Sequence, residues 1–121
     1  MLNGLAILIA EDQPLVALDL SQVVENFGGT VVGPVASVAE AMKCVAEHRV
    51  AGAILDANLI DRDVTPLAIL LIARGTPFVL YTGTGLPDEL AHAHPDLPII
   101  MKPAPAERVL DVLIERITNK C

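Results

Sequence analysis

The stretch AGAILD at residues 51–56 is a run of five small or apolar residues that ends in an aspartate. A run of this length is too short for a helix, and apolar residues at successive positions are typical of a strand buried on both faces. Four more apolar runs recur at similar intervals: LAILIA at 5–10, TVVG at 30–33, PFVLY at 77–81 and PIIM at 98–101. The sequence therefore predicts five buried strands, with the aspartate at the end of the third.

Helix signals fill the intervals between these runs. Pro14 suits the first turn of a helix and Gly28 suits a helix end, so a helix is predicted between them. A segment rich in proline and glycine leaves room for about two helical turns at 88–93. A last helix is predicted over 105–120. In the first helix, the apolar residues that recur near helical spacing are Leu15, Leu18, Val23 and Phe27.

Two further helices are marked by capping residues. Ser37 and Glu40 have the spacing of a capping box, in which the hydroxyl binds a backbone N–H of the first turn. Thr65 is expected to cap a helix that begins at Pro66 and stops at Gly75. Each of these helices would connect two of the predicted strands.

Strands that alternate with helices predict an α/β fold. We expect a doubly wound, five-stranded parallel sheet with helices on both faces and a short fourth helix. No linker, repeat or low-complexity segment interrupts the sequence, so residues 1–121 are expected to form one domain. In such sheets, ligands bind beyond the carboxyl ends of the strands. The residues that follow the predicted strands are therefore the candidate site residues.

Composition and charge narrow the function classes. The net charge of −7 argues against nucleic-acid binding, which needs basic patches. No apolar run approaches the roughly 18 residues that a membrane span needs. The N-terminus lacks a basic leader, so a cytoplasmic location is expected, in which Cys44 and Cys121 would stay reduced.

Polar side chains follow four of the five predicted strands, and carboxylates are prominent among them. Clustered carboxylates repel one another unless a cation lies between them, and Mg²⁺ prefers carboxylate and carbonyl oxygens. A carboxylate beside such a metal can attack phosphorus to form an acyl phosphate, while the metal and a lysine neutralise the transferring oxygens. The set therefore suffices for phosphoryl transfer to an aspartate. In chain order it comprises Glu11, Asp12, Asp56, Asn58, Thr82 and Lys102.

At these residues the sequence resembles the receiver domain of two-component response regulators, the CheY-like family. The matching segments are ILIAEDQPLV at 7–16, AILDANL at 53–59, FVLYTG at 78–83 and IIMKPA at 99–104. The spacing between the segments also suits the family, although the interval before Lys102 is slightly short. The resemblance extends over the whole chain.

The resemblance implies that Asp56 accepts a phosphoryl group from the phosphohistidine of a sensor histidine kinase or a phosphotransfer protein, in a Mg²⁺-dependent reaction. Thr82 would move toward the phosphoryl group on activation, and Lys102 would pair with it. The bond between Lys102 and Pro103 would be cis. Such a domain is a signalling protein that loses its phosphoryl group slowly, and not a turnover enzyme. The implied metal ligands are the carboxylates of Glu11, Asp12 and Asp56 and the backbone carbonyl of Asn58.

The sequence departs from the usual receiver pattern in two places. Receivers usually carry Phe or Tyr three residues before the lysine, where this chain has Ile99, and the aromatic residue here is Tyr81, next to the threonine. The loop NLIDRDVTP at 58–66 lacks the glycine that often ends it. The run PFVLYTGTG at 77–85 is similar to a receiver subgroup with a Phe-Ala-Thr-Gly-type motif. Many members of that subgroup are stand-alone domains that work with kinases of the HWE type.

Two alternatives remain open. The segment DRDVT at 61–65 fits the Asp-x-Asp-x-Thr pattern of haloacid-dehalogenase-type phosphohydrolases, with Asp61 as nucleophile and Asp63 as general acid. That motif normally follows the first strand directly, whereas these aspartates lie in a loop, so exposed loop acids are the simpler interpretation. The second alternative is a receiver-like binding module that signals without phosphate, which the missing aromatic at Ile99 favours.

Because 121 residues leave no room for an output domain, three interpretations are open: a regulator that binds partner proteins, a phosphate sink or shuttle, or a domain excised from a longer chain. By resemblance, the contact face is built from the fourth helix, the fifth strand and the last helix. The mean hydropathy of +0.56 gives slight support to a homodimer through that face.

Overall fold

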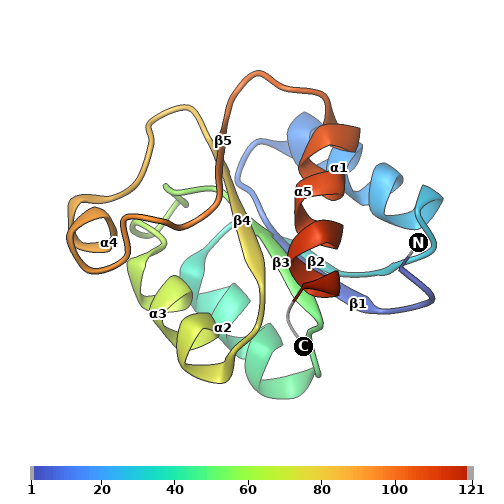
Figure 1. The fold of residues 1–121 in the computed structure, drawn as a ribbon, viewed down its shortest axis with the longest axis horizontal. Helices are drawn as coiled ribbons and strands as arrows, with labels where there is room; N and C mark the ends of the chain where they lie inside the picture. The colour runs from blue at the N-terminus through green and yellow to red at the C-terminus, as the bar shows by residue number, and fades with distance from the viewer. Residues whose placement is uncertain (1, 120–121) are drawn as a thin grey trace.

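The computed structural model describes residues 2–119, so Cys121 lies outside the described residues. Strands and helices alternate along the chain (Figure 1), and every predicted strand and helix is present, including the short fourth helix. The strands are β1 (Ala6–Ala10), β2 (Thr30–Val35), β3 (Gly52–Leu55), β4 (Phe78–Thr82) and β5 (Ile99–Met101). The helices are α1 (Pro14–Asn26), α2 (Val38–Glu47), α3 (Thr65–Arg74), α4 (Asp88–Ala93) and α5 (Ala106–Thr118). Within the described residues, no helix has the length and apolar character needed to cross a membrane.

The sheet is parallel throughout, with the strand order β2-β1-β3-β4-β5. The chain passes from β1 to β2 on one side and then to β3 on the other, which puts the switch point of strand order between β1 and β3. At the carboxyl ends of these two strands, Ala10 pairs with Leu55, and the Asp56 N–H donates to the Ala10 carbonyl at 2.9 Å. The residues that follow β1 and β3 therefore begin side by side, and the predicted doubly wound parallel sheet is confirmed.

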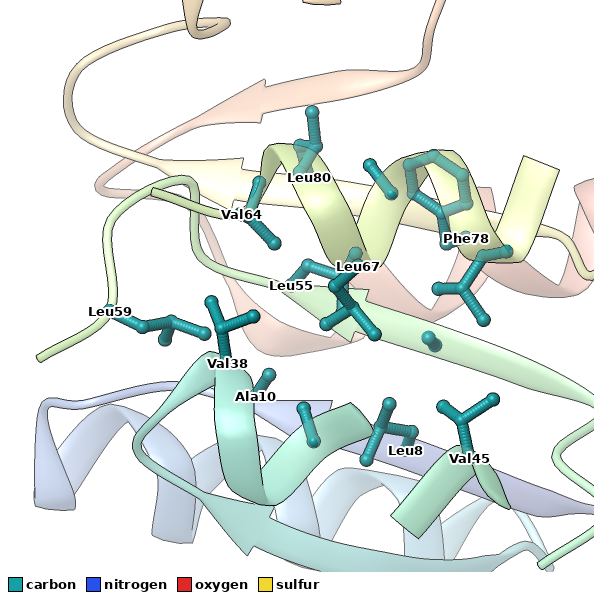
Figure 2. Close-up of a cluster of buried hydrophobic side chains, with 14 of the residues drawn as sticks. Leu8, Ala10, Val38, Val45, Leu55, Leu59, Val64, Leu67, Phe78 and Leu80 are labelled. Atoms are coloured by element: carbon teal, nitrogen blue, oxygen red, sulfur yellow. The ribbon is translucent and has the colours of Figure 1, made fainter. Parts of the chain in front are cut away.

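Helices cover both faces of the sheet, with α1 and α5 on one face and α2 and α3 on the other (Figure 1). Successive residues of a strand point to opposite faces, so β1 sends Leu8 toward α2 and α3, and Ile9 toward α1 and α5. This burial on both sides is why the strands are apolar at successive positions. Figure 2 shows the core on one face, where Val45 of α2 and Leu67 of α3 belong to the same cluster as Leu8 and Leu55.

Only part of the apolar set that the sequence suggested for α1 is buried: Val23 is buried and Phe27 packs against the same core cluster, whereas Leu15 and Leu18 are exposed. Leu15 and Leu18 are 81% and 64% exposed. A helix turns about 100° per residue, so only one stripe of α1 can face the sheet and α5. That stripe is the one that contains Ala17, whose small side chain allows close packing, and the side with the two leucines faces outward. The buried residues of α1 are Ala17, Leu20, Val23 and Val24.

The helix starts confirm one capping prediction and correct another. Ser37 caps α2 as predicted, because its Oγ accepts the Glu40 N–H at 3.0 Å. The prediction that Thr65 caps α3 is wrong: Thr65 is the first residue of the helix, and Asp63 Oδ1 accepts its N–H at 2.9 Å. An aspartate carboxylate readily reaches a backbone N–H two residues further on, so Asp63 supplies the acceptor instead. Gly75 ends α3 at a φ of 69°, a conformation that favours glycine.

Candidate functional site

The carboxyl ends of the strands bring four of the predicted site residues together. Glu11 follows β1 and Asp56 follows β3, which are neighbours in the sheet. Lys102 follows β5, and its Nζ lies 2.9 Å from Glu11 Oε1 and 3.1 Å from Asp56 Oδ2. Carboxylate oxygens of Glu11, Asp12 and Asp56 lie within 4.8 Å of one another. The predicted acids and the predicted lysine therefore form one cluster.

Lys102 has a third oxygen partner that the sequence did not suggest. Its Nζ donates to Gln13 Oε1 at 2.8 Å, in addition to its two carboxylate partners. An ammonium group has three N–H donors, so these three oxygens match its full capacity. The Nζ also lies 5.5 Å from the centre of the Tyr81 ring, within the range of a cation–π contact.

Tyr81 fixes the chain segment that follows the lysine. Its hydroxyl donates to the Ala104 carbonyl at 2.7 Å and accepts the Ala104 N–H at 3.1 Å. The Tyr81 ring packs in the core on the α1 and α5 side of the sheet, whereas Ile99 packs on the α2 and α3 side. The aromatic residue that this chain carries next to Thr82 therefore does not fill the space beside position 99.

Burial makes Glu11 an unusual acid. Its side chain is 1% exposed, and burial raises its pKa to about 7, although hydrogen bonds from Lys102 and from the Gln13 N–H act in the opposite direction. The pKa of Lys102 is also raised. Burial alone would lower it, but the hydrogen bonds to Glu11 and Asp56 outweigh burial. The lysine therefore stays charged and holds together carboxylates that would otherwise repel one another.

The donor set fits a hard divalent cation. Three carboxylates meet one ammonium group, so the ionised cluster keeps a negative charge that a divalent cation would balance. Mg²⁺ takes carboxylate and carbonyl oxygens and keeps several of its waters, for which a pocket beside the cluster has room. The residues that line this pocket, which has a volume of about 280 Å³, are Asp12, Gln13, Asp56, Asn58, Thr82, Gly83, Thr84 and Lys102.

The two remaining predicted residues, Thr82 and Asn58, both contact Thr84, a residue that the sequence patterns did not predict to belong to the site. Thr82 ends β4 and is 1% exposed, and Asn58 lies in the loop after β3. Between them stands Thr84, whose Oγ lies 3.2 Å from Thr82 Oγ and accepts a hydrogen bond from Asn58 Nδ2 at 2.7 Å. The position of Thr84 just beyond a strand end was visible in the sequence, but its partner on a different loop was not.

The two aspartates of the alternative phosphohydrolase motif, Asp61 and Asp63, do not line this pocket. Asp61 Oδ1 accepts the Val38 N–H at 2.8 Å and its Oδ2 accepts the Ala39 N–H at 3.1 Å, so its carboxylate caps α2 from a distant part of the chain. These hydrogen bonds, above all the one from Val38, lower the pKa of Asp61. Asp63 Oδ1 accepts the N–H of Thr65, the first residue of α3. Both carboxylates have structural contacts, which supports their interpretation as non-catalytic loop acids.

Asp61→Ala is expected to lower the melting temperature by a few degrees at neutral pH, because α2 loses an acceptor for two N–H groups. The lowered pKa means that this stabilisation is present above the ordinary value of 3.8 and is lost as the pH falls through the lowered value. Thermal unfolding followed by circular dichroism at neutral and acid pH checks both points. Asp96→Ala, which removes an exposed loop carboxylate, is the control. Equal melting temperatures for the two variants at neutral pH would contradict the capping role.

Solved structures of known proteins share this fold over nearly the whole chain. SdrG from Sphingomonas melonis Fr1 is 33% identical, with a TM-score of 0.79, over 98% of this chain and 99% of its own. A response regulator receiver protein from Sinorhizobium medicae WSM419 is 22% identical, with a TM-score of 0.85, over the full length of both chains. The chain belongs to the response regulator receiver family. Consistent with the resemblance, the Lys102–Pro103 bond of this receiver is cis.

Three further relatives are an activated form of SdrG, a receiver domain with bound magnesium and a longer regulator. SdrG has also been solved in a BeF3-activated conformation, at 38% identity and a TM-score of 0.72 over 93% of this receiver and 95% of that chain. The receiver domain of the sensor histidine kinase PA1611 from Pseudomonas aeruginosa PAO1 was solved with a magnesium ion in its active site cleft, at 20% identity and a TM-score of 0.80 over 96% of this receiver and 99% of that chain. The phyllosphere-induced regulator PhyR from Methylorubrum extorquens is 45% identical over 56 residues, which are 46% of this receiver and 21% of PhyR. No family model matches the sequence.

Proposed function

We propose that this receiver takes a phosphoryl group onto Asp56 from the phosphohistidine of a sensor histidine kinase or a phosphotransfer protein, in a Mg²⁺-dependent reaction. The observation that carries the proposal is the Lys102 ammonium group, which binds the carboxylates of Glu11 and Asp56 beside the pocket. A partly buried cation of this kind, next to a cluster of acids, can stabilise negative charge on a transferring phosphoryl group.

In the proposed step, an oxygen of Asp56 attacks phosphorus and forms the acyl phosphate bond. The bond between phosphorus and the donor imidazole nitrogen breaks, and its electron pair returns to the nitrogen. The ring takes one proton from solvent water and leaves as neutral imidazole. Lys102 and the Thr82 hydroxyl then donate to phosphoryl oxygens. The groups that would hold Mg²⁺ are the carboxylates of Glu11, Asp12 and Asp56 and the backbone carbonyl of Asn58. When bound, the ion neutralises charge on the phosphoryl oxygens.

Two relatives support this assignment. The BeF3-activated form of SdrG is a chain of nearly the same extent as this one, at 38% identity. The PA1611 receiver domain coordinates magnesium in its active site cleft. An acidic cluster of three carboxylates is present at the carboxyl ends of β1 and β3 in this chain. We extend both properties to this receiver as a proposal.

The proposal is tested by labelling with a small phosphodonor. The purified protein is incubated with acetyl phosphate, with Mg²⁺ or with EDTA, and its intact mass is measured. We expect at most one added phosphoryl group per chain, only with Mg²⁺, and its removal by hydroxylamine, which cleaves acyl phosphates. Repeated turnover of p-nitrophenyl phosphate would indicate a phosphohydrolase instead, and the absence of any uptake would indicate a binding module.

The donor protein is expected to contact the exposed leucines of α1. A donor histidine must reach Asp56 directly, so the surface around the site has to be covered during transfer. Leu15 and Leu18 are 81% and 64% exposed, and Leu18 lines a surface pocket together with Glu11 and Asp12. A phosphohistidine donor protein would bury these side chains when its histidine meets Asp56.

Leu15→Ala combined with Leu18→Ala is therefore expected to lower kcat/KM for transfer from a phosphorylated donor protein by about tenfold, the loss typical of interface residues that contribute about 1.4 kcal/mol. Labelling by acetyl phosphate should not change, because a small donor needs no docking surface. Ile69→Ala removes a 44% exposed side chain from α3 and is the matched control. Equal losses with both donors would show that the leucines act on the site itself and not on docking.

Output is proposed to pass through the face formed by α4, β5 and α5, where Met101 is 51% exposed. This face is also the proposed place for a homodimer. A cytoplasmic location, where sensor kinases present their phosphohistidine, belongs to the same proposal. Sedimentation with and without beryllofluoride tests the dimer, and a monomer in both states would exclude it.

A further inference from the structure

A chain of hydrogen bonds joins the loop after β3 to the loop after β4 at the phosphoacceptor pocket. Asn58 Nδ2 donates to Thr84 Oγ at 2.7 Å, and Thr84 Oγ lies 3.2 Å from Thr82 Oγ. The backbone N–H of Thr84 also donates to Thr82 Oγ at 3.2 Å. Asn58 and Thr82 therefore both contact the Thr84 hydroxyl, and all three residues line the pocket beside Asp56.

The amide of Asn58 sets the direction at one end of this chain, whereas the contact between the two hydroxyls allows either of them to donate. An amide NH₂ group can only donate, so Thr84 Oγ is an acceptor toward Asn58. A hydroxyl that accepts a hydrogen bond becomes a stronger donor, because hydrogen bonds in a chain polarise one another. Polarisation by Asn58 therefore favours Thr84 as the donor to Thr82 Oγ, which also accepts the Thr84 N–H.

With Thr84 as the donor, Thr82 Oγ has both of its lone pairs occupied. A threonine hydroxyl offers two lone pairs and one proton, so the only capacity left to Thr82 is its own O–H donor. Thr82 is 1% exposed, and the acceptor-rich space next to it is the pocket with Asp56. Phosphoryl oxygens only accept hydrogen bonds, so a phosphoryl group on Asp56 requires a donor in this direction.

We propose that Thr84 is a positioning residue: its hydroxyl relays a hydrogen bond from Asn58 to Thr82 and so orients the Thr82 proton toward a phosphoryl group on Asp56. The inference rests on the proposed function and deepens it. Through Thr84, the loop after β4 would contribute to phosphoryl binding although the Thr84 side chain does not contact the phosphoryl group. It also predicts that Thr84 acts through Thr82 alone.

Beryllofluoride, a phosphoryl mimic, is the probe for this relay. Its dissociation constant is measured with Mg²⁺ by ¹⁹F nuclear magnetic resonance, because the chain has no tryptophan. Thr84→Val keeps the shape of the side chain and removes the hydroxyl, and we expect it to weaken binding by about three- to tenfold, as for the loss of one hydrogen bond. Thr84→Ser keeps the hydroxyl and should bind within about twofold of the wild type. Thr84 is exposed, so neither variant should change the melting temperature.

A double-mutant cycle separates the relay from a merely structural role. Thr82→Val should weaken binding, and Thr84→Val should have no further effect in the Thr82→Val background. Wild-type affinity in Thr84→Val, an equal loss in Thr84→Ser, or an undiminished loss in the Thr82→Val background would overturn the relay while leaving the proposed function intact. Failure of the wild type to bind beryllofluoride, or equal binding by Asp56→Asn, would overturn the proposed function and this inference with it.

Discussion

Asp56→Asn is expected to reduce phosphoryl uptake from acetyl phosphate to background. An amide is a poor nucleophile at phosphorus, and it cannot form the acyl phosphate that the carboxylate forms. The replacement also removes one of the two carboxylate partners of Lys102, although Glu11 at 2.9 Å remains. The uptake is followed by intact-mass spectrometry, and the modified residue is located by proteolysis after trapping of the acyl phosphate.

Asp61→Asn and Asp63→Asn are the matched controls for this result. Both are aspartates of the same loop region, but their carboxylates bind the starts of α2 and α3 and do not line the pocket. Both should keep wild-type uptake. Normal uptake by Asp56→Asn would refute its role as the phosphoacceptor, and loss of uptake in Asp61→Asn without loss of folding would revive the phosphohydrolase hypothesis.

Mg²⁺ affinity is expected to fall about tenfold for each pH unit below 7, because ligand carboxylates must lose their protons before they bind a metal. Burial raises the pKa of Glu11 to about 7, so below this value the metal-free protein holds a proton that the ion has to displace. Above it the affinity should be constant. The charged groups around Glu11 are Asp12 and Asp56, which belong to the same proposed ligand set, and Lys102, whose raised pKa keeps it charged throughout.

Calorimetric titration of Mg²⁺ in two buffers of different ionisation enthalpy measures both the affinity and the proton released. Glu11→Gln should bind Mg²⁺ more weakly at high pH and should release no proton near pH 7. The raised pKa of Glu11 also affects stability, because the folded protein keeps a proton that the unfolded chain loses near pH 4.5. The metal-free wild type should therefore lose stability as the pH rises from 4.5 to about 7. Glu11→Gln should not show this loss. A constant Mg²⁺ affinity across one pH unit on either side of 7 would contradict the role given to Glu11.

The sequence predicts correctly those features that depend on interactions between residues close together in the chain. Each apolar run became a strand because side chains on both faces of a parallel sheet are buried, and the run that ends at Leu55 therefore placed Asp56 at a strand end. The Ser37 cap and the Gly75 stop were equally readable, since both depend on the backbone within one helical turn. Family membership also followed from residues at strand ends, which the parallel sheet gathers at one edge.

The orientation of α1 is a feature that local sequence patterns do not predict. Leu15 and Leu18 recur at a helical spacing, yet the buried stripe is the one with Ala17. The choice between two apolar stripes depends on how closely the helix approaches β2 and α5, which is a matter of tertiary packing. The result bears on the proposed function, because it leaves two leucines of α1 exposed near the proposed phosphoacceptor site.

The strands, most helix limits and the clustered residues Glu11, Asp56 and Lys102 follow from local sequence patterns, because the strand ends of a parallel sheet share one edge. The contacts between side chains of different loops, in contrast, depend on how the whole chain folds. Asp61 caps α2 and Thr84 joins two loops through contacts between residues more than twenty positions apart. Such contacts depend on the distance between loops in the folded chain, which no local pattern encodes.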